Sequence, residues 1–392
     1  MNKILLSSEI QEFINSNINS DVSKLALQKN KFTARDWVEI LNQIAAKQKA
    51  KTKLPTWFNS SNIYYPSKIS VEQTSSEKTA QYKSQLVSGY NLIDLTGGFG
   101  VDDFYFSKKI NQVTHCEINQ ELSEIVAHNF EQLQVKNVQC IAGDSSEILE
   151  DLKQKFDWIY IDPSRRNDAK GKVFMLQDCL PNVPEFLDFY FGFANNIMIK
   201  TAPFLDISAG LSELKNVKTI HIIALENEVK EMLWILEKNY SKSIQIVTCN
   251  LTKDAAEEFA FEFGNSSISN YSLPKKYLFE PNAAIMKSGG FNDITVRFEV
   301  EKLHQHSHLY TSDILVDFPG RVFKIENNFE YNKQNMKSFL ENKKSNITTR
   351  NFSETVENIR KKWKIKDGGN VYCFFTTAAN NNKIVLLCDK LK

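Results

Sequence analysis

Four short apolar runs, each ending in an acid, constrain most strongly what this chain can fold into. They occupy residues 91–95, 112–117, 138–144 and 156–163, with helical stretches between them. Such alternation predicts right-handed crossovers and a largely parallel α/β sheet. The acids are Asp94, Glu117, Asp144 and Asp162. Because ligands bind beyond the carboxyl ends of parallel strands, we expect these acids to line one crevice.

The remaining sequence predicts structural units on both sides of this sheet. Apolar residues spaced by three and four positions predict a helical N-terminal unit over 1–68. Further strands expected at 196–200 and 219–225 belong to an α/β domain of 69–268. Beyond it the alternation is lost, and a small α+β connecting region of 269–319 precedes a compact α+β domain of 320–392.

The composition excludes several classes of protein. The net charge of +1 gives no global field toward nucleic acid, so any basic surface has to be local. The six cysteines are scattered and form no CxxC pair, so we expect neither a zinc site nor a disulfide framework, and no metal. No signal peptide or membrane-spanning run is apparent, so a cytoplasmic location is expected.

The segments that follow the runs carry groups suited to a nucleoside ligand. Gly97, Gly98 and Gly100 form a turn that lets backbone approach a ligand closely, although its spacing departs from GxGxxG. At the end of the second run, Glu117 is placed to accept hydrogen bonds from ribose hydroxyls, a feature that dinucleotide enzymes share. Asp144 is placed to accept from an exocyclic amine such as that of adenine. Helix N-capping is the alternative interpretation of both acids.

The ordered set of Asp94 to Gly100, Glu117, Asp144 and Asp162-Pro163 resembles the motifs of class I S-adenosylmethionine (SAM)-dependent methyltransferases. The wider chain resembles a bacterial group of these enzymes with a C-terminal THUMP-like domain, through residues 70–83, 277–283 and 318–321. The resemblance implies a Rossmann-like methyltransferase sheet, a ferredoxin-like region at 269–319 and a THUMP-like RNA-binding domain at 320–392. It also implies SAM as the cofactor and RNA, either tRNA or rRNA, as the substrate.

The resemblance assigns site residues position by position. The residues that it implies for cofactor binding are Asp94, Thr96, Gly97, Gly98, Gly100, Glu117, Ile118, Asp144, Ser145 and Asp162. The residues that it implies for catalysis are Asp162, Pro163, Ser164 and Arg165. Thr96 stands where many relatives have the first glycine of the turn.

The fourth motif departs from the Asp-Pro-Pro-Tyr pattern of amino-methylating enzymes, because Ser164 and Arg165 replace the second proline and the aromatic residue. An arginine can stack on a base or bind phosphate, so Arg165 and Arg166 are candidates for either task, or are solvated surface charges. Enzymes that methylate carbon 5 of uridine need a cysteine after the fifth strand, where this chain has Lys200-Thr201-Ala202-Pro203. Direct transfer to a base nitrogen is therefore favoured over a covalent route.

The segment 321–366 is locally basic, with 12 Lys and Arg against 5 Asp and Glu. Interleaved cations and an aromatic residue suit phosphate contact with base stacking, and a solvated helix end is the alternative. The residues predicted to bind RNA are Arg166, Arg321, Arg360, Lys361, Lys362, Trp363 and Lys364. The stretch of His304, His306 and His308 predicts a solvated edge strand rather than a metal site.

The sequence leaves rival functions open. A methyltransferase acting on DNA or protein would carry the same cofactor motifs, as would an inactive SAM-fold protein that only binds RNA. An NAD-dependent oxidoreductase is disfavoured by the turn spacing and by Asp162-Pro163.

Overall fold

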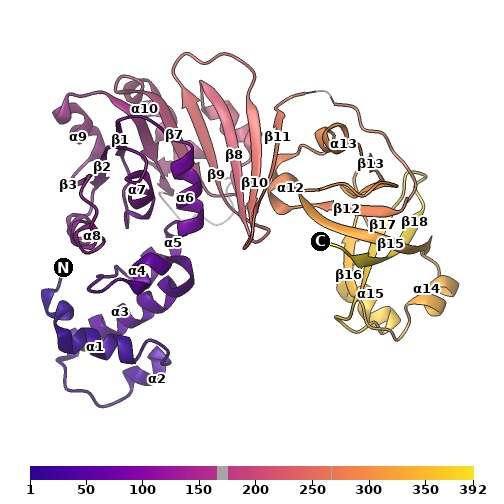
Figure 1. Ribbon diagram of the computed structural model, residues 1–392, viewed down its shortest axis with the longest axis horizontal. Helices are drawn as coiled ribbons and strands as arrows, with labels where there is room; N and C mark the ends of the chain where they lie inside the picture. The colour runs from indigo at the N-terminus through magenta and orange to yellow at the C-terminus, as the bar shows by residue number, and fades with distance from the viewer. Residues whose placement is uncertain (166–174, 266) are drawn as a thin grey trace. The chain divides into compact units, whose positions relative to one another are not determined.

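The structure, a computed structural model, describes residues 1–165, 175–265 and 267–392 of the chain (Figure 1). The chain divides into two compact units. The first comprises Met1–Thr219 and Glu231–Lys242, and the second comprises Ile220–Lys230 and Ser243–Lys392.

The N-terminal segment is helical, as predicted. Its elements are the 3-10 helix η1 (Lys3–Leu6) and the α-helices α1 (Ser8–Ser16), α2 (Val22–Ala26), α3 (Ala34–Lys53), α4 (Pro55–Asn59), α5 (Lys68–Gln73) and α6 (Glu77–Gln85). The start of α3 is capped by Thr33, whose hydroxyl accepts a hydrogen bond from the Asp36 N–H at 3.2 Å. Pro55 occupies the first turn of α4, where a missing N–H costs nothing.

The central part of the chain alternates between strands and helices. Its elements are β1 (Asn91–Asp94), α7 (Val101–Phe106), β2 (Gln112–Glu117), α8 (Gln120–Gln132), β3 (Val138–Ala142), α9 (Ser145–Leu152), β4 (Phe156–Ile161), β5 (Ser164–Arg165), η2 (Leu176–Asp178), β6 (Cys179–Leu180), α10 (Val183–Tyr190), β7 (Ala194–Thr201), α11 (Ile207–Glu213), β8 (Val217–Leu225), β9 (Glu228–Glu237), β10 (Gln245–Leu251) and β11 (Ala256–Glu262).

Nine of these strands form one sheet in the order β11-β10-β8-β9-β7-β4-β1-β2-β3. The strands β3, β2, β1, β4 and β7 pair in parallel, which follows from the helical crossovers between them. Strand β9 pairs antiparallel to β7, and β10 pairs antiparallel to β11. The predicted α/β sheet is therefore confirmed, but it is mixed rather than largely parallel.

The core of the first unit is shared between its helices. Buried side chains of the N-terminal segment, such as Ile40 and Trp57, belong to the same hydrophobic cluster as Phe104 of α7 and Val126 of α8. Helices α6 and α7 also pack against each other (Figure 1). The N-terminal helices thus contribute to the support of the segment that follows β1.

The second unit contains a seven-stranded mixed sheet in the order β13-β14-β12-β15-β18-β17-β16. Its elements are β12 (Tyr277–Pro281), α12 (Ala283–Ser288), α13 (Asp293–Phe298), β13 (Glu301–Lys302), β14 (Tyr310–Ser312), β15 (Gly320–Glu330), α14 (Lys333–Phe339), β16 (Asn346–Arg350), α15 (Val356–Trp363), β17 (Val371–Thr377) and β18 (Lys383–Lys390). Only β16 and β17 pair in parallel among the pairings within this sheet that the structure describes. Helices α14 and α15 bury Met336, Ile359 and Trp363 against it.

Candidate active site

The carboxyl ends of four parallel strands bring the predicted acids to one edge of the sheet. Asp94 and Glu117 are the last residues of β1 and β2, Asp162 follows β4 directly, and Asp144 follows β3 by two positions. Since β3, β2, β1 and β4 are parallel neighbours, their ends lie side by side. The sequence-predicted acids therefore lie along a common edge.

The glycine turn after β1 packs tightly on one side and is open on the other. A Cβ atom on Gly97 would lie 2.1 Å from Cε1 of the buried His115 ring, so no side chain fits there. Gly98 has a φ of +56°, and a Cβ atom on it would meet only the Thr96 carbonyl oxygen, at 3.7 Å. The turn thus presents an unobstructed backbone surface at Gly98, as close approach of a ligand requires.

Glu117 joins this turn to the end of β2. Its Oε2 atom accepts a hydrogen bond from the Gly98 N–H at 3.0 Å, and its Oε1 atom accepts from the Asn119 N–H at 2.8 Å. The neighbouring Ile118 is 76% exposed, so it offers an uncovered apolar surface directly after β2. An acid that is held in place beside an uncovered apolar surface suits a ribose and an aromatic base.

Asp144 is the N-cap residue of α9, and one of its carboxylate oxygens makes the capping hydrogen bonds. Its Oδ1 atom accepts hydrogen bonds from the Ser146 N–H at 2.8 Å and the Glu147 N–H at 3.4 Å. The residue remains exposed, and Ser145 beside it is half-buried. Capping and ligand contact are compatible, because one carboxylate has two oxygens.

Asp94 is a buried residue that stabilises the glycine turn through hydrogen bonds to Thr96. It is 2% exposed, and its Oδ1 atom accepts hydrogen bonds from both the N–H and the hydroxyl of Thr96. The Thr96 hydroxyl oxygen in turn accepts from the Asp162 N–H at 2.6 Å. Burial and the nearby Asp103 raise the pKa of Asp94 well above its usual range. Its burial therefore favours a structural role over the direct cofactor contact that was predicted.

Lys200 is a site residue that the sequence analysis did not identify. It lies near the end of β7, and its Nζ atom is 2.5 Å from Asp162 Oδ2. The Lys200 side chain is 12% exposed and that of Asp162 is 37% exposed. Burial alone would lower the pKa of Lys200, but Asp162, Asp102 and Glu231 raise it above its ordinary value. The ammonium group therefore stays charged beside the Asp162 carboxylate.

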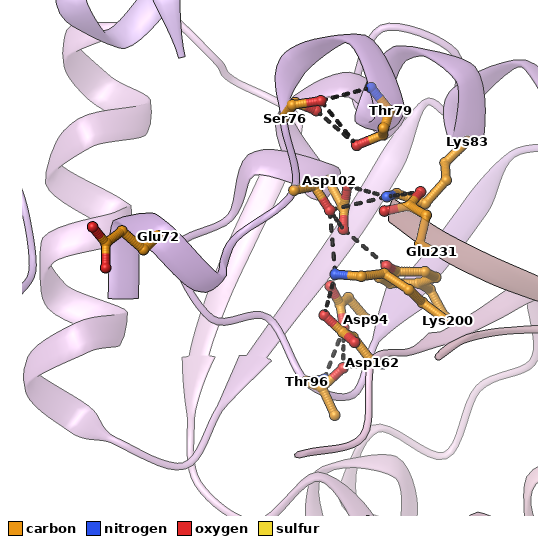
Figure 2. A network of polar contacts seen from close by, with 12 residues as sticks. Glu72, Ser76, Thr79, Lys83, Asp94, Thr96, Asp102, Asp162, Lys200 and Glu231 are labelled. Atoms are coloured by element: carbon orange, nitrogen blue, oxygen red, sulfur yellow. Dashed lines mark hydrogen bonds and ion pairs between the residues drawn. The ribbon is translucent and has the colours of Figure 1, made fainter. Parts of the chain in front are cut away.

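A buried cluster of charges lies next to this pair, above it in the view of Figure 2. Lys83 of α6 is fully buried, and its Nζ atom lies 2.7 Å from Glu231 of β9 and 3.2 Å from Asp102 of α7. The Ser75 hydroxyl accepts from Lys83 at 2.9 Å and from Lys200 at 3.3 Å. One serine oxygen thus bridges the buried cluster to the pair at the strand ends.

Asp102 is charged within this cluster because two cations face it. Burial by itself would raise its pKa, but Lys83, Lys200 and the hydroxyl of Tyr160 hold the pKa below its ordinary value. The Tyr160 hydroxyl donates to Asp102 Oδ2 at 2.8 Å. No local pattern signals this arrangement, since its members come from four elements far apart in the sequence.

The remainder of the fourth motif contributes to a two-stranded sheet. Ser164 and Arg165 make up β5, which pairs antiparallel with β6, and Ser164 is exposed. Pro163 is half-buried between Asp162 and this strand. The predicted roles of the Arg165 side chain and of Arg166 lie outside the described residues.

The structure separates the residues that were predicted to bind RNA. Trp363 is 7% exposed within the core beneath α15, and its indole N–H donates to the Tyr331 hydroxyl at 3.1 Å. The prediction that this ring stacks on a base is therefore wrong, because the amphipathic helix turns it inward. Lys361 and Lys364 lie on the exposed side.

Three further predicted RNA-binding cations that the structure describes have protein partners. Arg360 lies 2.5 Å from Asp367, and Lys362 lies 3.2 Å from Glu354. Arg321 donates from Nε to the buried Glu280 at 2.6 Å, and Arg350 donates to the same carboxylate. Arg321 thus has a structural partner, although its side chain remains 37% exposed.

The histidine stretch forms a turn between β13 and β14, so the predicted edge strand is wrong. His308 has a left-handed backbone, with a φ of 51°, which a strand cannot contain. Across the described parts of the chain, no group of acids, histidines and cysteines could hold a metal ion. In the same residues, no helix combines the length and the apolar character needed to cross a membrane.

Comparisons with known proteins identify the family. Residues 277–319 match a ferredoxin-like domain, and residues 320–390 match a THUMP-like domain. The whole chain is similar to the crystal structure of a "putative methyltransferase" from Porphyromonas gingivalis W83, at 30% identity and a TM-score of 0.89. That alignment covers 100% of this chain and 99% of the other. The chain belongs to this methyltransferase family.

Other solved methyltransferases resemble only part of this family member. A tRNA m1G37 methyltransferase from M. jannaschii is 12% identical, with a TM-score of 0.32 over 42% of this chain and 49% of that one. An rRNA methylase from Streptococcus thermophilus is 12% identical, with a TM-score of 0.30 over 41% of this chain and 95% of that one. Such low scores support no conclusion about substrate. No curated protein matches the chain.

Proposed function

We propose that this protein uses SAM to methylate a base nitrogen of RNA. The observation that carries the proposal is the row of strand ends after β2, β3 and β4, with Glu117, Asp144 and Asp162 along one edge beside an open glycine turn. When bound, SAM supplies an electrophilic methyl group attached to a sulfonium.

The residues at this edge fit the parts of SAM. We assign Glu117 to the ribose hydroxyls, because its carboxylate is already oriented by two backbone N–H groups. The exposed Ile118 would pack on the adenine, and Asp144 with Ser145 would face its amine. Gly97, Gly98 and Gly100 would border the methionine part, where Gly98 leaves room for a ligand.

Asp162 and Lys200 act at the acceptor end in this proposal. Lys200 holds Oδ2 of Asp162, so we assign Oδ1 to accept a hydrogen bond from the N–H of the base. The ion pair fixes the carboxylate, which orients the nitrogen lone pair and leaves an oxygen to receive the proton that methylation releases. No cysteine lies in the segment after β7, so direct transfer to nitrogen remains the favoured route.

RNA is the favoured substrate class because the THUMP-like region is locally basic. Lys361 of α15 and Lys364, the C-cap residue of that helix, are exposed, and among the described residues no ion pair involves either. Free cations on one helix suit contact with a phosphate backbone. The contribution of this helix is proposed to be charge, since its tryptophan is buried.

Calorimetry with SAM and its demethylated product tests the cofactor site. Glu117→Gln should weaken both ligands at least about tenfold, because a neutral amide is a poorer acceptor for two hydroxyls. Glu131→Gln, at an exposed position of α8, is the matched control and should bind as the wild type does. Absence of binding heat with the wild-type protein would refute the cofactor assignment.

Mass spectrometry of modified nucleosides tests the substrate. RNA from cells with and without the protein should differ in one methylated base, and the purified enzyme should restore that base in the deficient RNA. Asp162→Ala should bind SAM but fail to restore it. A modification that changes only in DNA or protein would redirect the substrate, and restoration by Asp162→Ala would remove this residue from the chemistry.

A further inference from the structure

The second unit contains a cavity that the methyltransferase site does not use. Its volume is about 320 Å³, close to the lower limit of small-ligand sites. The residues that matter for its chemistry are Tyr271, Phe291, Asn292, Lys302, His306 and His308. The tyrosine lies before β12, the phenylalanine and asparagine directly precede α13, the lysine ends β13, and the histidines lie in the turn that follows β13.

Lys302 is a buried cation with no acidic partner in the described structure. It is 3% exposed, and its Nζ atom donates to the amide oxygen of Asn292 at 3.3 Å. Ser269 donates to the same oxygen at 2.8 Å, so this acceptor is shared. Burial lowers the pKa of Lys302. Its ammonium group also lies 5.9 Å from the centroid of the Phe291 ring. A buried ammonium whose hydrogen-bond partner is a neutral amide is costly, and an anion entering the cavity would offset that cost.

The one carboxylate in the cavity lining is already engaged. Asp293 accepts a hydrogen bond from the Ser267 hydroxyl at 2.9 Å and a longer one from the Asn265 amide at 3.4 Å. In the part of the chain that the structure describes, Asp293 forms no ion pair with Lys302, whose Nζ atom donates to Asn292 instead. The acid therefore leaves the ammonium group uncompensated.

His308 provides a second, independent sign of a ligand site. Its ring stacks on Phe291, with 3.7 Å between centroids, and its Nδ1 atom is buried without a hydrogen-bond partner in the described residues. Its backbone is left-handed, with a φ of 51°. A strained residue with an unsatisfied buried nitrogen is the kind of feature that functional sites retain. An oxyanion would satisfy this nitrogen by accepting from its N–H tautomer.

Tyr271 supplies an aromatic surface beside these groups. It is 48% exposed, and its backbone forms a bridge with Lys302, which fixes the ring near the buried ammonium. Ile268 and Leu273 in the same segment are also exposed. Aromatic side chains next to a cation are typical of sites that bind a phosphate and stack on its base.

We propose that this cavity binds a phosphate group, held by Lys302 Nζ and His308 Nδ1, with the attached base on Tyr271. Assigning that phosphate to the substrate RNA rests on the proposed function. The cavity would then be a docking site for one nucleotide, apart from the methyl-transfer edge.

Binding of inorganic phosphate and of a short single-stranded RNA to the full-length protein tests this proposal. Lys302→Met keeps the aliphatic stem and removes the charge, so it should bind both ligands at least tenfold more weakly. Its own melting temperature should be unchanged or higher, because an uncompensated buried charge is gone. Lys253→Met, at an exposed position of the β10–β11 hairpin, removes the same charge and should bind as the wild type does.

A second pair of variants separates the phosphate from the base. His308→Phe retains the stacked ring and removes Nδ1, so it should weaken phosphate binding even if Lys302→Met fails to fold. Tyr271→Ala should weaken the oligonucleotide and leave inorganic phosphate unaffected. The proposal is overturned if the wild type binds neither ligand, or if Lys302→Met and His308→Phe bind both as the wild type does.

SAM titration distinguishes this proposal from the proposed function. Lys302→Met should retain wild-type affinity for SAM, since the cavity lies outside the first unit. Phosphate binding without SAM binding would refute the cofactor assignment alone. Weaker binding of phosphate by Lys302→Met with unchanged oligonucleotide affinity would overturn the assignment to RNA.

Discussion

The Nζ atom of Lys200 lies 2.5 Å from Asp162 Oδ2, so an ion pair joins the ends of the parallel strands β7 and β4. The pair sits where the chain would meet a methyl acceptor, and Ser75 connects it to the buried Lys83 cluster. Its removal should therefore affect both catalysis and folding.

Lys200→Met should lower turnover by at least about 100-fold, because Asp162 loses the group that orients it. It should also lower the free energy of unfolding by about 3 kcal/mol, since Asp102 and Glu231 lose a buried counter-charge. Steady-state kinetics and urea denaturation measure the two effects. Lys218→Met breaks the exposed pair with Glu237 and should cost under about 1 kcal/mol. Full turnover in Lys200→Met would contradict the assigned role.

Gly97→Ala and Gly98→Ala should fail in different ways. The first places a Cβ atom 2.1 Å from the His115 ring, so it should cost about 1–3 kcal/mol of stability by overpacking. The second meets no packed neighbour but occupies the open side of the turn, so it should weaken SAM at least about tenfold, with about 1–2 kcal/mol of backbone strain. Calorimetry and thermal unfolding of both variants check the contrast, and equal SAM affinity in Gly98→Ala and the wild type would contradict it.

His221 should make the stability of the protein sensitive to mild acid. Burial lowers the pKa of His221 from 6.5 to about 4 in the folded state. Below pH 6.5, His221 therefore becomes protonated in the unfolded chain but stays neutral in the folded chain. The stability that is present above pH 6.5 is lost as the pH falls toward 4. The loss from this residue should approach about 3 kcal/mol. Denaturation from pH 7 to 4 should show a shallower decline in His221→Gln, and an NMR titration measures the pKa directly.

Glu280 should be essential for the stability of the second unit. Its side chain is 3% exposed and binds both Arg321 and Arg350. Glu280→Gln should cost about 2–3 kcal/mol, because two partly buried guanidinium groups lose their shared charge. Glu326→Gln breaks only the exposed pair with Lys324 and should cost under about 1 kcal/mol. Equal denaturation midpoints for the two variants would contradict the prediction that the buried Glu280 stabilises the protein more than the exposed Glu326 does.

Replacing Lys361 and Lys364 with alanine should weaken RNA binding and lower its salt dependence. Each lost phosphate contact reduces the slope of log affinity against log salt by about 0.7 for single strands. Fluorescence titrations at several salt concentrations measure this slope. Lys253→Ala serves as the control for loss of charge elsewhere in the second unit. An unchanged slope in the double variant would show that Lys361 and Lys364 do not contact the RNA phosphates.

The strands that the sequence predicted are those with an unambiguous local pattern. Apolar runs ending in acids located β1 to β4. Burial on both faces accounts for this signal in β1, β2 and β4, whereas β3 is only partly buried. No strand was predicted at Glu228–Glu237, although residues 232–236 form a continuous buried apolar run of the same kind. That strand makes the sheet mixed, and it also carries Glu231.

The buried charges could not be predicted for a different reason. Lys83 and Lys200 sit in stretches that look ordinary, and their partners lie up to 148 residues away. A lysine can be recognised as part of a buried charge cluster only when the tertiary structure shows that its side chain is shielded from solvent. Trp363 was wrongly predicted to be exposed, because its neighbours in the sequence are basic. Its position on the helix places the ring on the face that packs into the core.

The full burial of Lys83 limits how far the methyltransferase portion can be truncated from its N-terminal side. A fragment that started at β1 would contain every strand-end acid yet lack the nearest cation of Asp102 and Glu231. Lys200 would then be the one cation left near both carboxylates, and the buried ion pairs that Lys83 makes with them would be lost. The smallest piece able to fold by itself therefore has to begin upstream of α6.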